Sequence, residues 1–146
     1  MEEAARTVAE AMLTAPVRHP PAATVGEIRE FFRDDHVHAA LIVGPSGQLQ
    51  AVVERGDLAG GQSADTAARL GRLAGRTVPP GASLAEAHRV MAAAGQRRAA
   101  VTSAGGQLLG LLCLKASQVG FCSDQDVCAR AQDRARPGAA AEAGTN

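Results

Sequence analysis

The chain repeats itself: residues 20–58 can be laid over residues 79–117 without a gap, at a constant offset of 59 positions. A repeat of this length indicates two copies of one small structural unit rather than one continuous domain. Several aligned pairs are identical, and each pair suits the same structural task in both copies. The identical residues, named in the first copy, are Pro20, Pro21, Ala23, Glu27, Ala40, Gly47, Gln48 and Leu49.

Each copy contains the signature of a helix start. Thr24 and Glu27 have the spacing of a capping box, in which hydroxyl and carboxylate each bond to a free backbone N–H. Ser83 and Glu86 repeat this spacing in the second copy. Apolar residues follow both caps at helical intervals, which predicts an amphipathic helix in each copy. They are Val25, Ile28, Phe31 and Phe32 in the first copy and Leu84, Ala87, Val90 and Met91 in the second.

Behind each helix the sequence predicts a β-hairpin. Residues 40–43 and 49–53 are short apolar runs separated by a turn that contains glycine. The second copy has the same pattern at residues 99–102 and 108–112. An extended segment precedes each helix, at residues 16–18 and 76–78, and a helical stretch precedes that, at residues 7–12 and 65–74.

These elements give an α+β protein of two repeats, each with a short sheet packed against helices. We expect residues 1–62 to form the first repeat with its linker and residues 63–130 the second. Residues 124–134 could form a last helix, and the Ala- and Gly-rich residues 131–146 read as a flexible tail.

Composition excludes several classes of function. Lys plus Arg and Asp plus Glu both number 15, so no net charge draws the chain to nucleic acid or to an anionic membrane. No apolar run approaches the roughly 20 residues of a membrane span. Three unevenly spaced cysteines, Cys113, Cys122 and Cys128, suit a reducing compartment and behave as structural thiols. We therefore expect a cytoplasmic protein that binds neither nucleic acid nor membrane.

The order of extended segment, helix and hairpin, given twice, resembles the tandem CBS (cystathionine-beta-synthase type) domain pair. The resemblance covers roughly residues 6–127. Each copy of that family opens with a pattern like the one at residues 8–12 here. It closes with Gly, two apolar residues, Ser or Thr, any two, and then Asp. The closing motifs of this chain lie at residues 51–58 and 110–117.

The resemblance implies a stand-alone pair of repeats related by a pseudo-twofold axis, with two clefts between them. It also implies a regulatory module, not an enzyme, that needs no cofactor and binds an adenosine-containing ligand of the AMP, ATP or S-adenosylmethionine class. The closing Asp of the family accepts from ribose hydroxyls and the Ser or Thr faces phosphate. Here Asp57 is retained and Glu54 takes the hydroxyl position, whereas Cys113 and Ala116 replace both groups in the second copy.

The expected ligand site is therefore the cleft of the first copy. It comprises Asp57, Glu54 and Arg55 together with Ala15, Pro16 and Val17, and we expect no catalytic or metal-binding residues. Glu54 would repel phosphate by about 4 kcal/mol at 4 Å, so a ligand with a neutral or cationic tail is favoured. Asp57 could equally be a helix cap.

Arg97 and Arg98 lie where the second helix meets its strand and could bind phosphate, although surface charge is the favoured interpretation. The alternative function is a protein-interaction or dimerisation module that has lost its ligand. A homodimer is expected in either case, because a unit of about 60 residues cannot hide wide apolar stripes alone. Phe31, Phe32, Val90 and Met91 belong to these stripes.

Overall fold

A computed structural model describes residues 6–122 of the chain. The two repeats have matching elements. The first contains β1 (Arg18–His19), α3 (Val25–Phe31), β2 (Ala39–Val43) and β3 (Leu49–Glu54). The second contains β4 (Thr77–Val78), α4 (Leu84–Ala94), β5 (Arg98–Thr102) and β6 (Leu108–Cys113). The segments around them hold α2 (Val8–Ala11) and the 3₁₀ helices η1 (Arg55–Leu58) and η2 (Ala67–Leu70).

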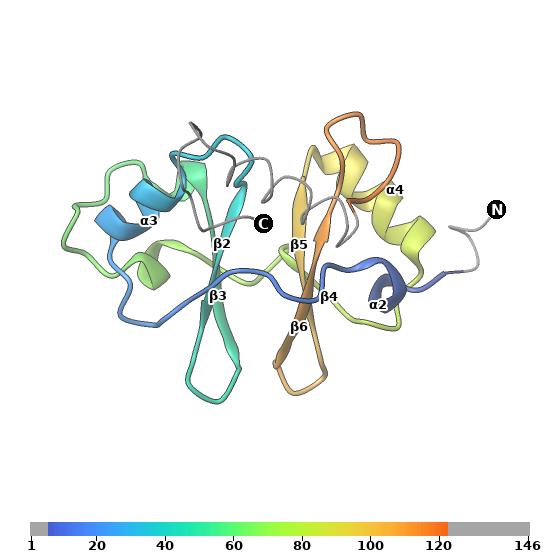
Figure 1. Ribbon diagram of the computed structural model, residues 1–146, viewed down its shortest axis with the longest axis horizontal. Coiled ribbons are helices and arrows are strands. Elements are labelled where there is room, and N and C mark those ends of the chain that lie inside the picture. The colour runs from blue at the N-terminus through green and yellow to red at the C-terminus, as the bar shows by residue number, and fades with distance from the viewer. Residues whose placement is uncertain (1–5, 123–146) are drawn as a thin grey trace, which may run out of the picture.

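Each repeat builds the same three-stranded sheet. β1 runs parallel to β2, which pairs antiparallel with β3, and β4, β5 and β6 repeat this order. Both hairpins even carry an irregularity at the equivalent place, after Ile42 in β2 and after Val101 in β5. Figure 1 shows the halves side by side with their hairpins pointing the same way, as a pseudo-twofold axis requires. The α+β fold class predicted from sequence is confirmed.

The helix starts follow from the capping residues. The Thr24 hydroxyl accepts from the Glu27 amide at 3.2 Å, and the Glu27 carboxylate accepts from the Thr24 amide at 2.8 Å, so this capping box is complete. The Ser83 hydroxyl accepts from the Glu86 amide at 3.2 Å. The Glu86 carboxylate pairs with Arg89.

The segment that precedes each repeat packs against the other one. Leu13 pairs with Leu111 of β6 through two backbone hydrogen bonds, and Val8 lies in the core of the second repeat. Arg72 pairs in the same way with Val52 of β3, and Ala67 lies in the core of the first. Figure 1 shows both crossings, the blue chain from α2 to the first half and the green chain back toward β4. The predicted boundary between the repeats at residues 62 and 63 stays a prediction. The packing shows in addition that each repeat receives the segment that precedes the other repeat.

Sheet contacts across the pseudo-twofold axis join the repeats. Side chains of all four hairpin strands form one buried apolar cluster, of which Leu41, Val52 and Leu111 are fully buried members. The two hairpin turns are hydrogen-bonded to each other as well. The Leu49 amide donates to the Gly106 carbonyl, and the Leu108 amide donates to the Gly47 carbonyl. Burial on this scale is worth about 25 cal/mol per Å² of apolar surface, so the repeats form one hydrophobic unit.

Two sequence expectations need correction. The predicted helix at residues 65–74 is only the short 3₁₀ helix η2, because the chain must extend at Arg72 to pair with β3. Phe32 and Met91 are buried in the cores of their own repeats and are not part of an open stripe, whereas Val90 is 55% exposed. The predicted helix at residues 124–134 and the tail lie outside the described residues. No helix among residues 6–122 is long and apolar enough to cross a membrane.

The crossing of residues 12 and 13 over β6 requires a glycine beneath it. A Cβ atom at Gly110 would lie 2.5 Å from the Leu13 carbonyl oxygen and 2.6 Å from the Met12 sulfur. We predict that Gly110→Ala lowers the free energy of unfolding by about 1–3 kcal/mol, the usual cost of overpacking, in a urea titration. Gly105→Ala is the control, because a Cβ there meets only the Ser103 hydroxyl at 4.0 Å. Equal losses in both variants would contradict the crossing.

Candidate functional site

A cavity of about 490 Å³ lies between the repeats, where β3 ends and β5 begins. The first repeat supplies His38, Glu54, Arg55 and Gly56. The other side consists of residues from two loops: Arg72, Ala74, Gly75 and Arg76, then Ala94, Gly95, Gln96, Arg97 and Arg98. Five arginines and one glutamate line this cavity, here called the arginine cleft, so its net charge is positive.

Arg76 is the organising side chain of the arginine cleft. Its side chain is only 6% exposed, and its Nη1 donates to the Val52 carbonyl at 2.7 Å. The same guanidinium holds the Asp57 carboxylate with two bonds of 2.6 and 3.1 Å. It also lies 3.2 Å from a Glu54 carboxylate oxygen. A buried guanidinium needs such partners because desolvation of an unpaired charge costs several kcal/mol.

Asp57 lies behind the cleft wall, at the third position of η1. Its carboxylate accepts from the Glu54 amide at 2.8 Å, so Asp57 is the N3 residue of a capping box whose N-cap is Glu54, and the expected role of Asp57 as the N-cap itself is wrong. Burial raises the pKa of Asp57, but hydrogen bonds from Arg76 and the Glu54 amide outweigh it. The charges of Arg76 and Arg72 act in the same direction, and the net effect is a pKa below the ordinary 3.8.

Glu54 lines the cleft, but it does not present an uncompensated charge. Its side chain is 38% exposed and paired with Arg76. Arg76, which sequence reasoning did not place there, offsets part of the repulsion expected between Glu54 and phosphate, although Asp57 shares the same guanidinium. The preference for a neutral or cationic tail has no support in this geometry.

The other arginines of the cleft differ in how many of their N–H donors bond to protein atoms. Arg55 donates to the carbonyls of Phe32 and Val37 and lies over the Phe32 ring. Arg98 is buried and donates to the His36 carbonyl of the first repeat at 3.0 Å, so the interpretation as surface charge is wrong for Arg98.

Arg72 and Arg97 retain the most hydrogen-bonding capacity. Arg97 donates through Nε alone, to the Leu114 carbonyl at 2.8 Å. The Arg72 side chain is exposed and bonds to none of the described residues. Guanidinium groups that line a cavity with free N–H donors are suited to phosphate and carboxylate ligands.

His38 responds to the positive charge of the cleft. Burial, and then the charges of Arg98, Arg97, Arg55 and His36, lower the pKa of His38 to about 4. The imidazole is therefore neutral at pH 7 and adds no further cation. An anion bound beside it would oppose the arginine charges and raise this pKa.

Ala15, Pro16 and Val17 do not line the arginine cleft. They follow Leu13, which pairs with β6, so the chain carries them past the second repeat before it enters β1. The cleft of Asp57 receives instead residues 74–76, which lie 59 positions later. The sequence-based prediction assigned the segment before β1, whereas the equivalent segment before β4 lines this cleft. No local sequence pattern shows that the two segments cross to the other repeat.

The corresponding place in the second repeat is apolar. With the offset of 59 residues, Leu13, Val17, Cys113 and Ala116 stand where the arginine cleft has Arg72, Arg76, Glu54 and Asp57. Leu13 and Cys113 are buried together there with Cys122. Among residues 6–122, no three His, Cys, Asp or Glu side chains could hold a metal ion. The four positions that carry charge in the first repeat are thus uncharged in the second.

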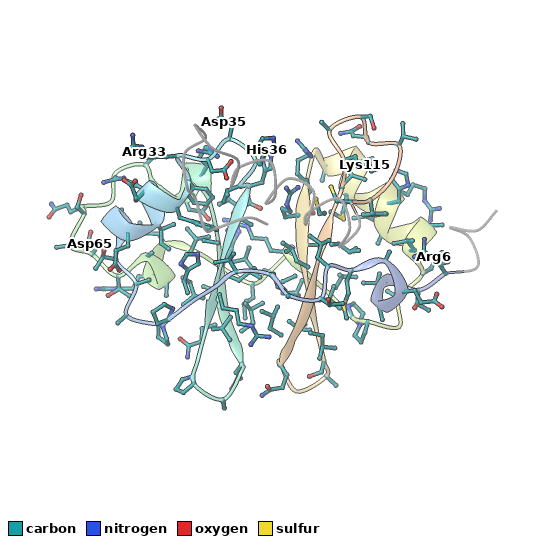
Figure 2. The ribbon with its side chains drawn as sticks, viewed as in Figure 1. Arg6, Arg33, Asp35, His36, Asp65 and Lys115 are labelled. Carbon is teal, nitrogen blue, oxygen red and sulfur yellow. The ribbon has the colours of Figure 1, made fainter. Side chains whose placement is uncertain are left out.

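The Asp57–Arg76 pair predicts a pH-dependent stability. Because the folded pKa of Asp57 is depressed, its stabilising contribution is complete above 3.8 and disappears as pH falls through the lower folded value. Asp57→Asn should lower the free energy of unfolding by about 1.5–3 kcal/mol at pH 7. The gap in free energy of unfolding between the wild-type protein and this variant should narrow in this acid range. Urea titrations from pH 7 to 2 measure this. Asp35→Asn is the control, since Asp35 points outward (Figure 2), and an unchanged gap at low pH would contradict the assignment.

The comparisons with known proteins agree with this architecture. Residues 76–116 match the CBS domain family. No curated protein matches the chain. A putative acetoin utilization protein (AcuB) from Vibrio cholerae shares 17% identity over 90% of this chain and 98% of its own, with a TM-score of 0.64. A CBS domain protein of Pyrobaculum aerophilum complexed with AMP shares 20% identity over 84% and 91%, with a TM-score of 0.60.

The cytosolic domain of the Mg²⁺ channel MgtE in complex with ATP is similar as well, with 21% identity over 75% of this chain and a TM-score of 0.60. The chain spans 45% of the length of that structure. Identities this low establish the fold alone. The resemblance expected from the sequence is confirmed at this level: the second repeat matches the CBS domain family, and residues 6–122 fold as a tandem CBS pair.

Proposed function

We propose that this chain is a non-catalytic regulatory module that binds one adenosine-containing anion per chain in the arginine cleft. The observation that carries the proposal is the set of five arginines around one cavity, of which Arg72 and Arg97 keep free donors. Structures with the same fold contain AMP or ATP, which supports this ligand class. The ligand requires no metal or further cofactor in this proposal.

The groups of the cleft suit the parts of such a ligand. Arg72 and Arg97 would donate to phosphate, because charge-assisted bonds to a guanidinium are about twice as strong as neutral ones. Glu54 faces the cleft with one carboxylate oxygen paired to Arg76 and the other available to ribose hydroxyls. Asp57, proposed from sequence as a ribose acceptor, lies behind the wall and would contribute by holding Arg76 in place. Ala15, Pro16 and Val17, proposed from sequence, lie outside this arrangement.

We predict that AMP binds more tightly than adenosine and that Arg97→Gln reduces this difference, with Arg72 left as the remaining donor to phosphate. The loss of a charged donor to phosphate should weaken AMP binding about tenfold or more and leave adenosine within twofold, since such a bond is worth about 1.5–3 kcal/mol. Glu54→Gln should weaken both ligands alike. Isothermal titration calorimetry measures the affinities of both ligands for the wild-type protein and for the two variants.

Arg69→Gln is the matched control, because Arg69 is an exposed arginine of η2 that does not line the cleft. Equal affinity of the wild-type protein for AMP and adenosine would overturn the assignment of Arg97. If neither ligand binds at millimolar concentration, the module acts through protein contacts alone, which is the alternative function.

We propose further that the protein is a cytoplasmic homodimer. Val90 of α4 is 55% exposed beside an apolar cavity of about 240 Å³ lined in part by Val78, Ala87 and Met91. In the first repeat Phe31 takes the place of Val90 and packs edge-on against His19, with ring centroids 4.4 Å apart. Of the two equivalent helices α3 and α4, α4 therefore has the more open apolar face for a second copy.

Sedimentation velocity at tens of micromolar should show a dimer, and Val90→Glu should shift it to monomer because a buried, unpaired carboxylate is costly. Val119→Glu is the control, since Val119 is 79% exposed in the loop after β6 and does not belong to the α4 face. A monomer in the wild-type protein, or equal effects of both variants, would contradict this interface.

A further inference from the structure

Cys113 and Cys122 form a pair of thiols that the arginine cleft does not use. Their sulfur atoms are 2.7 Å apart, and both side chains are buried. The Cys122 amide donates to the Cys113 carbonyl at 2.7 Å, and Leu114 and Phe121 form the next antiparallel pair. The two cysteines therefore lie directly opposite each other on neighbouring extended segments.

This arrangement satisfies the geometry of a disulfide. Directly opposed, hydrogen-bonded residues of an antiparallel pair have Cα atoms about 5.5 Å apart. Disulfides require Cα separations of about 4.4–6.8 Å. The backbone therefore needs no rearrangement for a bond between these two sulfur atoms.

The loop between the cysteines gives solvent a route to them. Residues 115–119 are all exposed, and Val119 is 79% exposed. Among the described residues, the loop is held by a Lys115–Gly120 backbone hydrogen bond, a turn bond from the Gln118 amide to the Lys115 carbonyl, and contacts of Gln118 and Phe121 with the His88 ring. Figure 2 shows Lys115 at the open edge of the second half, away from the hairpin turns. Local opening of such a loop exposes buried groups without global unfolding.

We propose that Cys113 and Cys122 are a reversible thiol–disulfide site whose co-reactant is a low-molecular-weight disulfide. One thiolate attacks a sulfur of that disulfide and releases one thiol, and the second cysteine then attacks the mixed disulfide and releases the other. One external S–S bond breaks and one protein S–S bond forms. The protein gives up two electrons and two protons, which appear in the two released thiols.

Oxidation would tie the loop of residues 114–121 to the end of β6. The pair occupies the second repeat where the first has Glu54 and the arginine cleft, together with the buried Leu13. In the reduced state the loop depends on these noncovalent contacts, whereas in the oxidised state it is closed covalently at this apolar site. Intracellular disulfides of this kind are usually transient and sense redox conditions.

The test uses the full chain with Cys128→Ser, so that only the two paired thiols remain. The protein is equilibrated in a glutathione buffer, blocked with N-ethylmaleimide and digested with trypsin. Cleavage after Arg98, Lys115 and Arg130 separates the cysteines into peptides 99–115 and 116–130. We expect these peptides to be joined, with at least about tenfold more linked product than from guanidinium-unfolded chain, because the fold raises the effective concentration of the pair.

Dithiothreitol should release the linked peptides, and oxidation should slow hydrogen exchange of amides 115–121 in the native protein. The matched control, Cys113→Ser with Cys128→Ser, should give no linked product. Linked product no greater than in the unfolded chain, or only mixed disulfides with glutathione, would overturn the proposal. The experiment contains no nucleotide, so its result is independent of the function proposed for the arginine cleft.

Discussion

The Arg76 guanidinium is buried between the repeats and bonded to three groups of the first repeat. It holds the end of β3 through the Val52 carbonyl and the start of η1 through Asp57, and it balances the charge of Glu54. Its backbone follows the segment that pairs with β3 and leads into β4. One side chain thus fixes the wall of the cleft and the path of the crossing chain. Removal of Arg76 would leave the Asp57 and Glu54 carboxylates without the cation that pairs with both.

This constraint explains why two similar repeats provide unlike clefts. The residue equivalent to Arg76 is Val17, and the residue equivalent to Asp57 is Ala116. Without a buried cation there is no reason for acidic partners nearby, and the second repeat fills the place with Leu13, Cys113 and Cys122. The pseudo-symmetry of the backbone therefore does not extend to the chemistry of its clefts.

The sequence predicted those elements that depend on local patterns. Thr24 with Glu27 and the paired apolar runs contain the information for helix starts and hairpins within a few residues. The exchange of residues 7–13 and 66–72 depends on tertiary packing that no local pattern reports. For the same reason the sequence predicted only an extended segment at Arg76 and gave no sign of the contact between Arg76 and Glu54. The sequence placed a candidate ligand site near Glu54 and Arg55, which line the arginine cleft, but the arginines from the second repeat became visible only in the three-dimensional arrangement.

We propose one anion-binding cleft per chain, organised by Arg76, and no anion site at the equivalent position beside Leu13 and Cys113. Equilibrium dialysis of the purified protein against radiolabelled AMP counts the sites directly. The account predicts saturation at one AMP per chain, whatever the oligomeric state. Saturation at two per chain would show that the equivalent position also binds the anion, and no binding at millimolar AMP would show that the arginine cleft does not; either result would contradict it.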